Sequence, residues 1–135
     1  MESLLSKLNY KANDNIVIFN MPEEFTDIEV SISKEIKVYK NNTAIKTEFI
    51  LVFVRKKSGL DDFILKNKDY LLSFEDDLIW FAYPKTSSKK YEGKTDITRD
   101  KNWDSLLNIG YKGVRMVSID DDWSAFRFRK VEYIK

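Results

Sequence analysis

The chain has 135 residues, 43% of them hydrophobic and 14% aromatic, which is enough to bury one core without disulfides or a structural metal. Charged residues make up 33%, yet the formal net charge is only +1, so the totals do not favour a polyanionic partner. The absence of histidine and cysteine excludes histidine acid–base catalysis, thiol nucleophiles, disulfides and ordinary zinc sites.

The N-terminal segment "MESLLSKLNYK" contains Glu2 and lacks a continuous apolar core, so it does not have the pattern of a signal peptide. No run in the sequence approaches the roughly 20 apolar residues of a membrane span. We therefore expect a soluble, cytoplasmic protein that forms one domain over residues 1–135 and does not associate with a membrane.

The first third of the chain predicts, in order, a short helix over 4–8, a strand over 15–20, a helix over 21–32 and a strand over 35–40. The run "NIVIFN" is apolar throughout, which is typical of a strand buried on both faces of a parallel sheet. Asn20 is the predicted N-cap of the following helix, and Pro22 fits its first turn.

The rest of the chain predicts a strand over 48–55, a helix from 58 to 71, a strand over 77–83, a helix near 103–107, and strands over 112–119 and 123–130. Asp61 is placed for a capping-box contact at the start of the second long helix. Gly110 is expected to end the helix before it. Asp120, Asp121 and Asp122 form the turn of a closing antiparallel hairpin.

Alternation of strands and helices indicates an α/β fold with a Rossmann-like, mostly parallel sheet of about six strands. Helices are expected on both faces, and the last two strands form a C-terminal antiparallel hairpin. Only about eight residues separate Tyr39 from Glu48, fewer than a parallel crossover normally takes. Either this link runs extended across the sheet, or the second strand pairs differently.

Several segments carry a resemblance to a known family, namely "LLSKLNYK", "FNMPEEF", "ILVFVRKKSGLDDFI", "LIWFAYPKTSSK", "TDITRD" and "DDDWSAFRFRK". Together they resemble small uncharacterised bacterial proteins that form a domain of unknown function related to the S-adenosylmethionine-dependent methyltransferase fold. The resemblance covers nearly the whole chain. It implies a Rossmann-like sheet with a methyltransferase-type final hairpin, and it implies no activity.

Two landmarks of a working methyltransferase are missing from the sequence. The turn after the first strand, "FNMPEEF", has no glycine to let the backbone approach a cofactor, and Glu23 and Glu24 already supply negative charge to the helix terminus. The second strand ends in Asn41 and Asn42 where an acidic residue would grip ribose hydroxyls. We therefore expect no cofactor and no methyl transfer.

The loop over 83–100 is the strongest candidate site because it leaves the carboxyl end of a buried strand, where α/β sheets bind ligands. Five positive and three negative side chains give it a net positive charge, and its hydroxyls add donors suited to an anion. The predicted ligand-binding residues are Lys85, Ser87, Ser88, Lys90, Thr95 and Arg99, with Asp120, Trp123 and Arg127 placed on the same rim by the family resemblance.

The leading interpretation is a non-catalytic module that binds a small anion or a protein partner and has no catalytic residues or metal. The alternative is a small enzyme for an anionic substrate, with Lys85 or Lys90 as polarising group and Asp96 or Asp120 as base. A plain solvated loop also explains the pattern, with Thr95 or Asp96 as a helix N-cap and Arg99 paired with Asp100 on the surface.

Three further patterns have ordinary explanations. The Ser-x-x-Lys spacing of acyl-transfer enzymes occurs at Ser87–Lys90 and again at Ser31–Lys34, so it is not specific. The run 120–122 could ligate a divalent cation, but such runs are more often hairpin turns. A basic face on 123–130 could contact nucleic acid; balanced total charge instead favours an edge strand guarded by its arginines.

Overall fold

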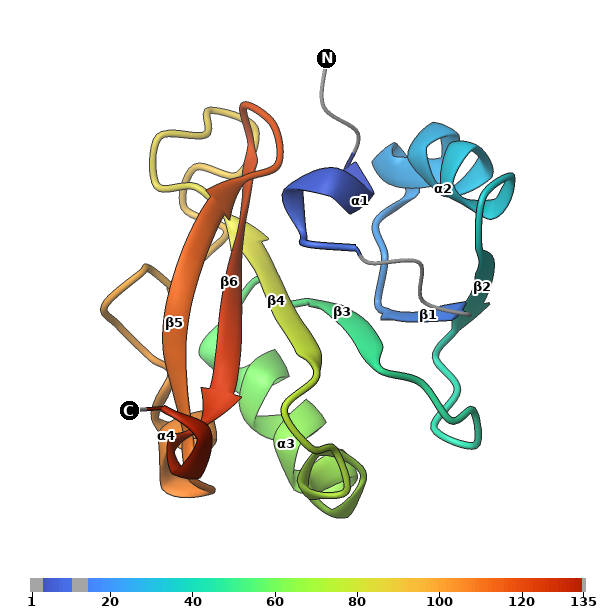
Figure 1. The fold of residues 1–135 in the computed structure, drawn as a ribbon. Coiled ribbons are helices and arrows are strands. Elements are labelled where there is room, and N and C mark those ends of the chain that lie inside the picture. The colour runs from blue at the N-terminus through green and yellow to red at the C-terminus, as the bar shows by residue number, and fades with distance from the viewer. Residues whose placement is uncertain (1–3, 11–14, 135) are drawn as a thin grey trace.

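The computed structural model describes residues 4–10 and 15–134, so Glu2 and Lys11 of the N-terminal segment lie outside the described residues. Its centre is a six-stranded sheet in the order β2-β1-β3-β4-β6-β5 (Figure 1). The four strands β2, β1, β3 and β4 are parallel, and β6 and β5 are antiparallel to their neighbours. The strands are β1 Asn15–Phe19, β2 Lys37–Lys40, β3 Phe49–Phe53, β4 Leu78–Pro84, β5 Tyr111–Ser118 and β6 Trp123–Lys130.

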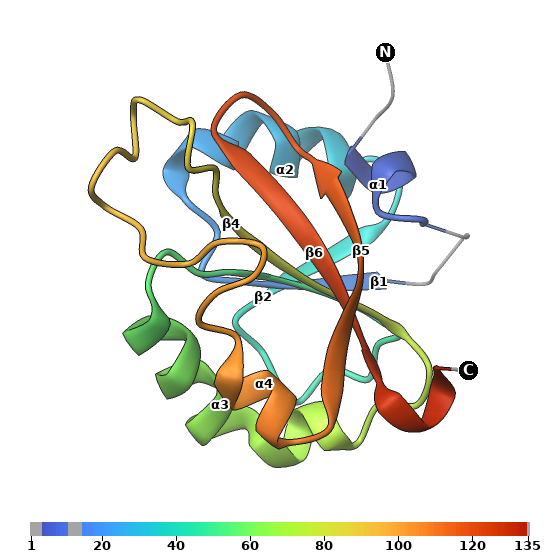
Figure 2. The same ribbon diagram turned by 90° about the vertical axis from the view of Figure 1, so that its left-hand side faces the viewer.

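Helices cover both faces of this sheet (Figure 2). One face carries α1 (Leu4–Lys7), the 3-10 turn η1 (Glu23–Phe25) and α2 (Thr26–Ser33). The other carries α3 (Lys57–Leu72) and α4 (Asp104–Asn108), while the turn η2 (Val131–Tyr133) follows β6. The predicted α/β, Rossmann-like architecture with a C-terminal antiparallel hairpin is thereby confirmed. In the described part of the chain, no helix has the length and apolar character needed to cross a bilayer.

Strand β3 lies between two hydrophobic cores, and its sequence reflects this position. Phe49, Leu51 and Phe53 pack toward α1 and α2, whereas Ile50 and Val52 pack toward α3. Every residue of the strand is buried. Because successive side chains of a strand point to opposite faces, a strand covered on both sides must be apolar at every position.

The link between β2 and β3 crosses the sheet without a helix. Strands β2 and β3 pair with opposite sides of β1, so residues 41–48 must pass over β1. Tyr39 and Ile45 pack against the same core as α3. Eight residues are enough to connect β2 to β3 because the link contains only a turn and irregular backbone and no crossover helix. Of the two alternatives, the link across the sheet is the one observed, and β2 pairs in parallel.

The final hairpin corrects one interpretation of the sequence. Strand β6 pairs with both β4 and β5, and β5 is the outermost strand. The prediction that residues 123–130 form an edge strand is therefore wrong. Strand β6 forms backbone hydrogen bonds with a neighbouring strand on each side. Arg127 and Phe128 do face opposite sides of the sheet, since Phe128 belongs to the α3 core. Gly110 follows α4 with φ of +93°, as the predicted helix end requires.

Candidate functional site

The turn after β1 is built by two asparagines. Asn20 has φ of +60°, a left-handed conformation that asparagine tolerates better than most residues. Its backbone N–H donates to Oδ1 of Asn41 at 2.9 Å, and the N–H of Asn41 donates to the carbonyl of Ile18 at 2.9 Å. The prediction that Asn20 caps a helix is wrong, since Pro22 occupies that position before η1. Asn20 supplies the positive φ, and the side chain of Asn41 holds the turn.

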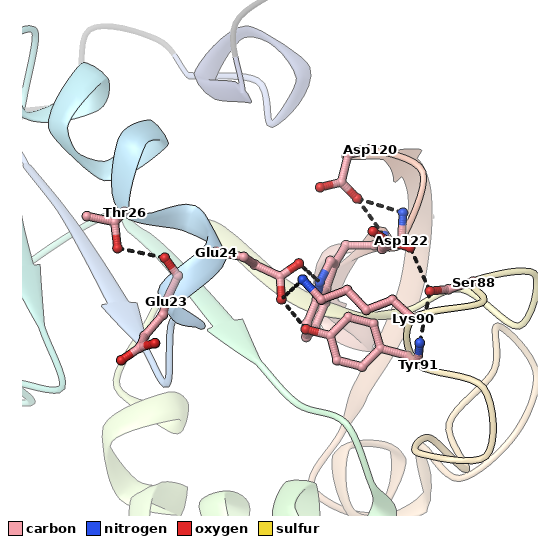
Figure 3. A network of polar contacts seen from close by, with 9 residues as sticks. Glu23, Glu24, Thr26, Ser88, Lys90, Tyr91, Asp120 and Asp122 are labelled. Atoms are coloured by element: carbon pink, nitrogen blue, oxygen red, sulfur yellow. Dashed lines mark hydrogen bonds and ion pairs between the residues drawn. The ribbon is translucent and has the colours of Figure 1, made fainter.

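Glu24 of this turn is bound by side chains from distant parts of the chain (Figure 3). The hydroxyl of Tyr91 donates to Oε1 of Glu24, and Nζ of Lys90 lies 3.2 Å from the same oxygen. The indole Nε1 of Trp123 donates to Oε2 at 3.2 Å. Burial, together with the hydrogen bond to Glu24, raises the pKa of Tyr91 to about 12. The carboxylate at the start of the first helical turn is thus fully engaged by the protein itself.

Hydrogen bonds fasten the loop after β4 to the final hairpin (Figure 3). Ser88 is buried; its Oγ donates to Oδ1 of Asp122 at 2.7 Å and accepts the N–H of Tyr91 at 3.2 Å. Oδ1 of Asp120 accepts the N–H groups of Asp122 and Trp123, both at 2.8 Å. Asp120 therefore shapes a turn. Of the nine predicted site residues, Ser88, Lys90, Asp120 and Trp123 come together here, in contacts that hold the loop in place.

Lys85, Ser87 and Arg99 line a separate hollow of about 310 Å³. Nζ of Lys85 donates to Oγ of Ser118 at 2.6 Å, which uses one of its hydrogens. Arg99 is 72% exposed at its side chain and lies 4.0 Å from Asp100, at the limit of an ion pair. Among the predicted cations, Arg99 and Lys90 are exposed, whereas Lys85 is half-buried.

Thr95 and Arg127 lie apart from both groups. Oγ1 of Thr95 accepts the N–H of Ile97 at 3.3 Å, a local turn contact. Arg127 pairs with Trp80 in the middle of β4, about 13 Å along β6 from Trp123. Its Nε is buried with no hydrogen-bond partner among the described residues, and burial, with the neighbouring charge of Arg129, lowers its pKa. Arg127 does not share the rim of the loop.

The sequence interpretation missed a basic hollow of about 420 Å³ between the loop and α3. Its lining is Arg55, Lys56, Ser58, Gly59, Gly93 and Lys94. Arg55, Lys56 and Lys94 form no ion pair with any carboxylate in the described residues. The signal in the sequence was the run "RKK", which begins two residues after the last residue of the buried strand β3 and so places cations at its carboxyl end.

A second hollow, of about 210 Å³, adjoins the basic one. It is lined by Asn20, Pro22, Phe53, Val54, Arg55, Gly59 and Trp123. Arg55 and Gly59 belong to the lining of both hollows. The two spaces therefore meet at the carboxyl ends of β1 and β3, where open α/β sheets bind their ligands.

The first turn of α3 is capped from the loop. The N–H of Lys57 donates to Oδ1 of Asp96 at 2.6 Å across 39 positions of sequence. The predicted capping-box contact of Asp61 is wrong, because its Oδ2 lies 2.6 Å from Nζ of Lys57. This hydrogen bond lowers the pKa of Asp61. Ser58 and Gly59 follow in the first turn, where backbone N–H groups have no acceptor within the helix.

Another hollow, of about 710 Å³, lies at the opposite edge of the sheet, before β3 and β4. Its lining includes Glu48, Glu75 and Asp77. Burial, with the nearby negative charges of Glu48 and Glu75, raises the pKa of Asp77. This concentration of carboxylates is unfavourable for an anion, in contrast to the basic lining at the carboxyl edge.

Known proteins share the fold of this chain but not its sequence. No protein-family model matches it, and no curated protein does. A protein of the NADB-Rossmann superfamily from Streptococcus agalactiae is 8% identical, with a TM-score of 0.54 over 96% of this chain and 68% of that one. A candidate tRNA (m1A22) methyltransferase from Streptococcus pneumoniae is 8% identical, with a TM-score of 0.51 over 96% and 70%. These likenesses show a Rossmann-like, methyltransferase-like fold.

Proposed function

We propose that this protein is a non-catalytic binding module that holds a small anion in the basic hollow between α3 and the loop after β4. The observation that carries the proposal is the charge of the lining. Arg55, Lys56 and Lys94 contribute three positive charges, and the lining contains no carboxylate. Charge-assisted hydrogen bonds from such groups are about twice as strong as neutral ones.

Backbone groups add to this positive surface. The hollow includes Ser58 and Gly59 in the first turn of α3, where the helix dipole is positive. Glycine at 59 and at 93 leaves the backbone uncovered by side chains, and a Cβ at either position would meet nothing within 4 Å. A compact anion such as phosphate matches cations without carboxylate partners that lie beside the first turn of a helix.

Lys85 and Arg99 remain a second proposed location for an anion within the predicted loop. Their hollow also includes Asp100, so its lining is less positive than that around Arg55. The loop that carries Lys94 is held in place by contacts of Ser88, Lys90, Asp120 and Trp123. In this proposal these four residues position the loop and do not bind the anion. A finer relationship to the uncharacterised bacterial family named above remains a prediction.

Methyl transfer is the second candidate, because the methyltransferase-like fold is the one observation that favours it. Two features weigh against it. Glu24 and its partners occupy the turn after β1, and the adjoining hollow of about 210 Å³ is small beside the roughly 300–1,000 Å³ of ordinary ligand sites. An enzyme using Asp96 or Asp120 as base is weakly supported, since both carboxylates accept backbone N–H groups.

A thermal-shift titration with pyrophosphate, inorganic phosphate and S-adenosylmethionine tests the proposal. Pyrophosphate at about a hundred times its dissociation constant is expected to stabilise the fold by about 2.7 kcal/mol, a shift of several degrees. The variant Arg55→Ala/Lys94→Ala should lose most of this shift. Lys68→Ala/Lys112→Ala removes the same charge from exposed sites outside the hollow and should keep it.

The other outcomes each identify a different error. A shift abolished only by Lys85→Ala/Arg99→Ala would move the anion site to the other end of the loop. A shift with S-adenosylmethionine and none with pyrophosphate would replace the proposal with the methyltransferase alternative. If no compound stabilises the protein, anion binding is wrong and a protein partner becomes the leading explanation for the basic surface.

A further inference from the structure

Helix α3 begins without a side-chain cap from its own N-cap residue. That residue is Lys56, which has no side-chain oxygen to accept a hydrogen bond. The N–H of Lys57, the first residue of the helix, donates instead to Oδ1 of Asp96 at 2.6 Å. The loop after β4 therefore supplies the carboxylate at the start of this helix.

Asp96 is also the point at which this part of the loop is anchored. Nδ2 of Asn102 donates to the carbonyl oxygen of Asp96 at 2.5 Å, and the next residue, Ile97, is fully buried in the core beside α3. Lys94 comes two positions before Asp96, so their Cα atoms are at most about 7 Å apart. The place of Lys94 in the lining of the basic hollow therefore depends on where Asp96 is held.

The carboxylate of Asp96 lies beside the basic hollow but outside its lining. Lys56 and Ser58, the chain neighbours of Lys57, both line the hollow, whereas Asp96 does not. Asp96 therefore leaves the space free for a ligand. Its negative charge still acts on that space, because charges interact over a Debye length of about 8 Å at physiological salt.

We propose that Asp96 affects anion binding in two opposite ways. Its hydrogen bond to the start of α3 positions Lys94 at the hollow, which strengthens binding, and its negative charge opposes the anion, which weakens binding. This inference rests on the proposed function and adds to it a residue that sets the affinity without lining the site. Asp96 is thus a positioning residue that also limits how tightly the anion is held.

Two substitutions separate these effects. Asp96→Asn removes the charge but keeps an oxygen that accepts the N–H of Lys57, and asparagine caps helices about as well as aspartate. Asp96→Ala removes both the charge and the acceptor. The two variants have the same charge, so a difference in their anion affinities reports the hydrogen bond. Asp100→Asn removes one charge from the same loop, at a side chain that is 89% exposed, and is the control.

The experiment measures the dissociation constant of pyrophosphate by calorimetric titration. At about 0.15 M salt we expect Asp96→Asn to bind about threefold more tightly than wild type, and by a larger factor at about 0.01 M, where charges are less screened. Asp100→Asn should bind like wild type. Asp96→Ala should bind about threefold more weakly than Asp96→Asn, because Lys94 loses its place and its charge-assisted contact.

A Lys94→Ala background tests whether the hydrogen bond acts through Lys94. In that background Asp96→Ala and Asp96→Asn should bind pyrophosphate equally, because no Lys94 side chain remains to be positioned. A role of Asp96 only in the stability of the helix would leave their difference in affinity unchanged. Circular dichroism and thermal unfolding confirm that each variant is folded at the temperature of the titration.

Unchanged affinity in Asp96→Asn would overturn the effect of charge, as would an equal gain for Asp100→Asn. Equal affinities of Asp96→Asn and Asp96→Ala, or a difference that persists without Lys94, would overturn the positioning role. In each of these cases the proposed function stands if Arg55→Ala/Lys94→Ala still abolishes pyrophosphate binding. If pyrophosphate does not bind wild type, or binds independently of Arg55 and Lys94, the proposed function fails and this inference fails with it.

Discussion

Tyr91 donates its hydroxyl hydrogen to Glu24, a residue 67 positions earlier in the chain. The contact joins the loop after β4 to the turn after β1 (Figure 3). The contact therefore holds the loop against the turn after β1, and the same loop brings Gly93 and Lys94 to the side of α3.

Removing this hydroxyl should weaken the fold. Tyr91→Phe leaves the ring in place, since the ring packs edge-on against Trp123 with centroids 5.1 Å apart. A hydrogen bond to a charged acceptor contributes about 1.5–3 kcal/mol, so urea unfolding should show a loss of this order. Tyr39→Phe on the outermost strand β2 is the control and should change stability little. An equal effect of both substitutions would contradict a special role for the contact with Glu24.

Alkaline pH should destabilise the protein through its buried tyrosines. Burial raises the pKa values of Tyr70, Tyr83 and Tyr91 to about 12, above the unfolded value of about 10. Because these folded-state values are raised, the stability they contribute is fully present below about pH 10 and is lost as the pH rises toward 12.

Urea unfolding measured across this pH range tests the sign of the effect. Wild type should lose more free energy of unfolding than Tyr91→Phe, which has one fewer titrating group. Parallel curves for the two proteins would show that Tyr91 ionises as readily in the folded chain as in the unfolded one.

Asp77→Asn should stabilise the protein near neutral pH. Burial and neighbouring carboxylates raise the pKa of Asp77, so its contribution to stability is complete below about pH 4 and declines as the pH rises through the folded-state value. Asparagine mimics the neutral form and can still accept the N–H of Glu75. The melting temperature should rise near pH 7 and match wild type near pH 3.

Asp121→Asn is the matched control for this substitution because Asp121 is exposed in the hairpin turn. It removes the same charge and should change the melting temperature little at either pH. A gain for Asp121→Asn as large as that for Asp77→Asn would trace the effect to total charge and not to the buried position.

The cap on α3 makes a prediction that links the loop to the helix. Asp96→Ala removes the acceptor for the N–H of Lys57 and should cost about 0.5–2 kcal/mol of stability. Asp100→Ala, at a side chain that is 89% exposed, is the control. Hydrogen exchange should accelerate at the first turn of α3 in the first variant only. Unchanged exchange there would mean that the helix start does not depend on the loop.

The sequence predicted the fold correctly where burial determines which residue types a strand can contain. The apolar runs at 15–20 and 48–55 correspond to β1 and β3 because a strand covered on both faces admits no polar position. The position of β6 inside the sheet was not predictable from its arginines. Edge strands and internal strands can both have a charged face. Only the hydrogen-bonded strand pairs show which of the two β6 is.

The candidate site was predictable in part. The loop after β4 was correctly singled out as lying at the carboxyl edge, but the partners of Ser88 and Lys90 depend on residues 34 and 66 positions away, Asp122 and Glu24. Capping by Asp96 was assigned to the wrong helix for the same reason. Arg55 was overlooked because a cation after a strand has no distinctive spacing, and its significance appears only when Lys94 lies across the same hollow.

The most direct measurement of the central claim is a titration of pyrophosphate followed by amide NMR. The chain has only 4 glycines, whose amide signals fall in a distinct part of the spectrum. Gly59 and Gly93 line the basic hollow, whereas Gly110 and Gly113 lie at the start of β5. Pyrophosphate is expected to shift the first two signals and to leave the last two unchanged. Shifts at Gly110 and Gly113, or none at Gly59 and Gly93 at saturating pyrophosphate, would contradict the central claim.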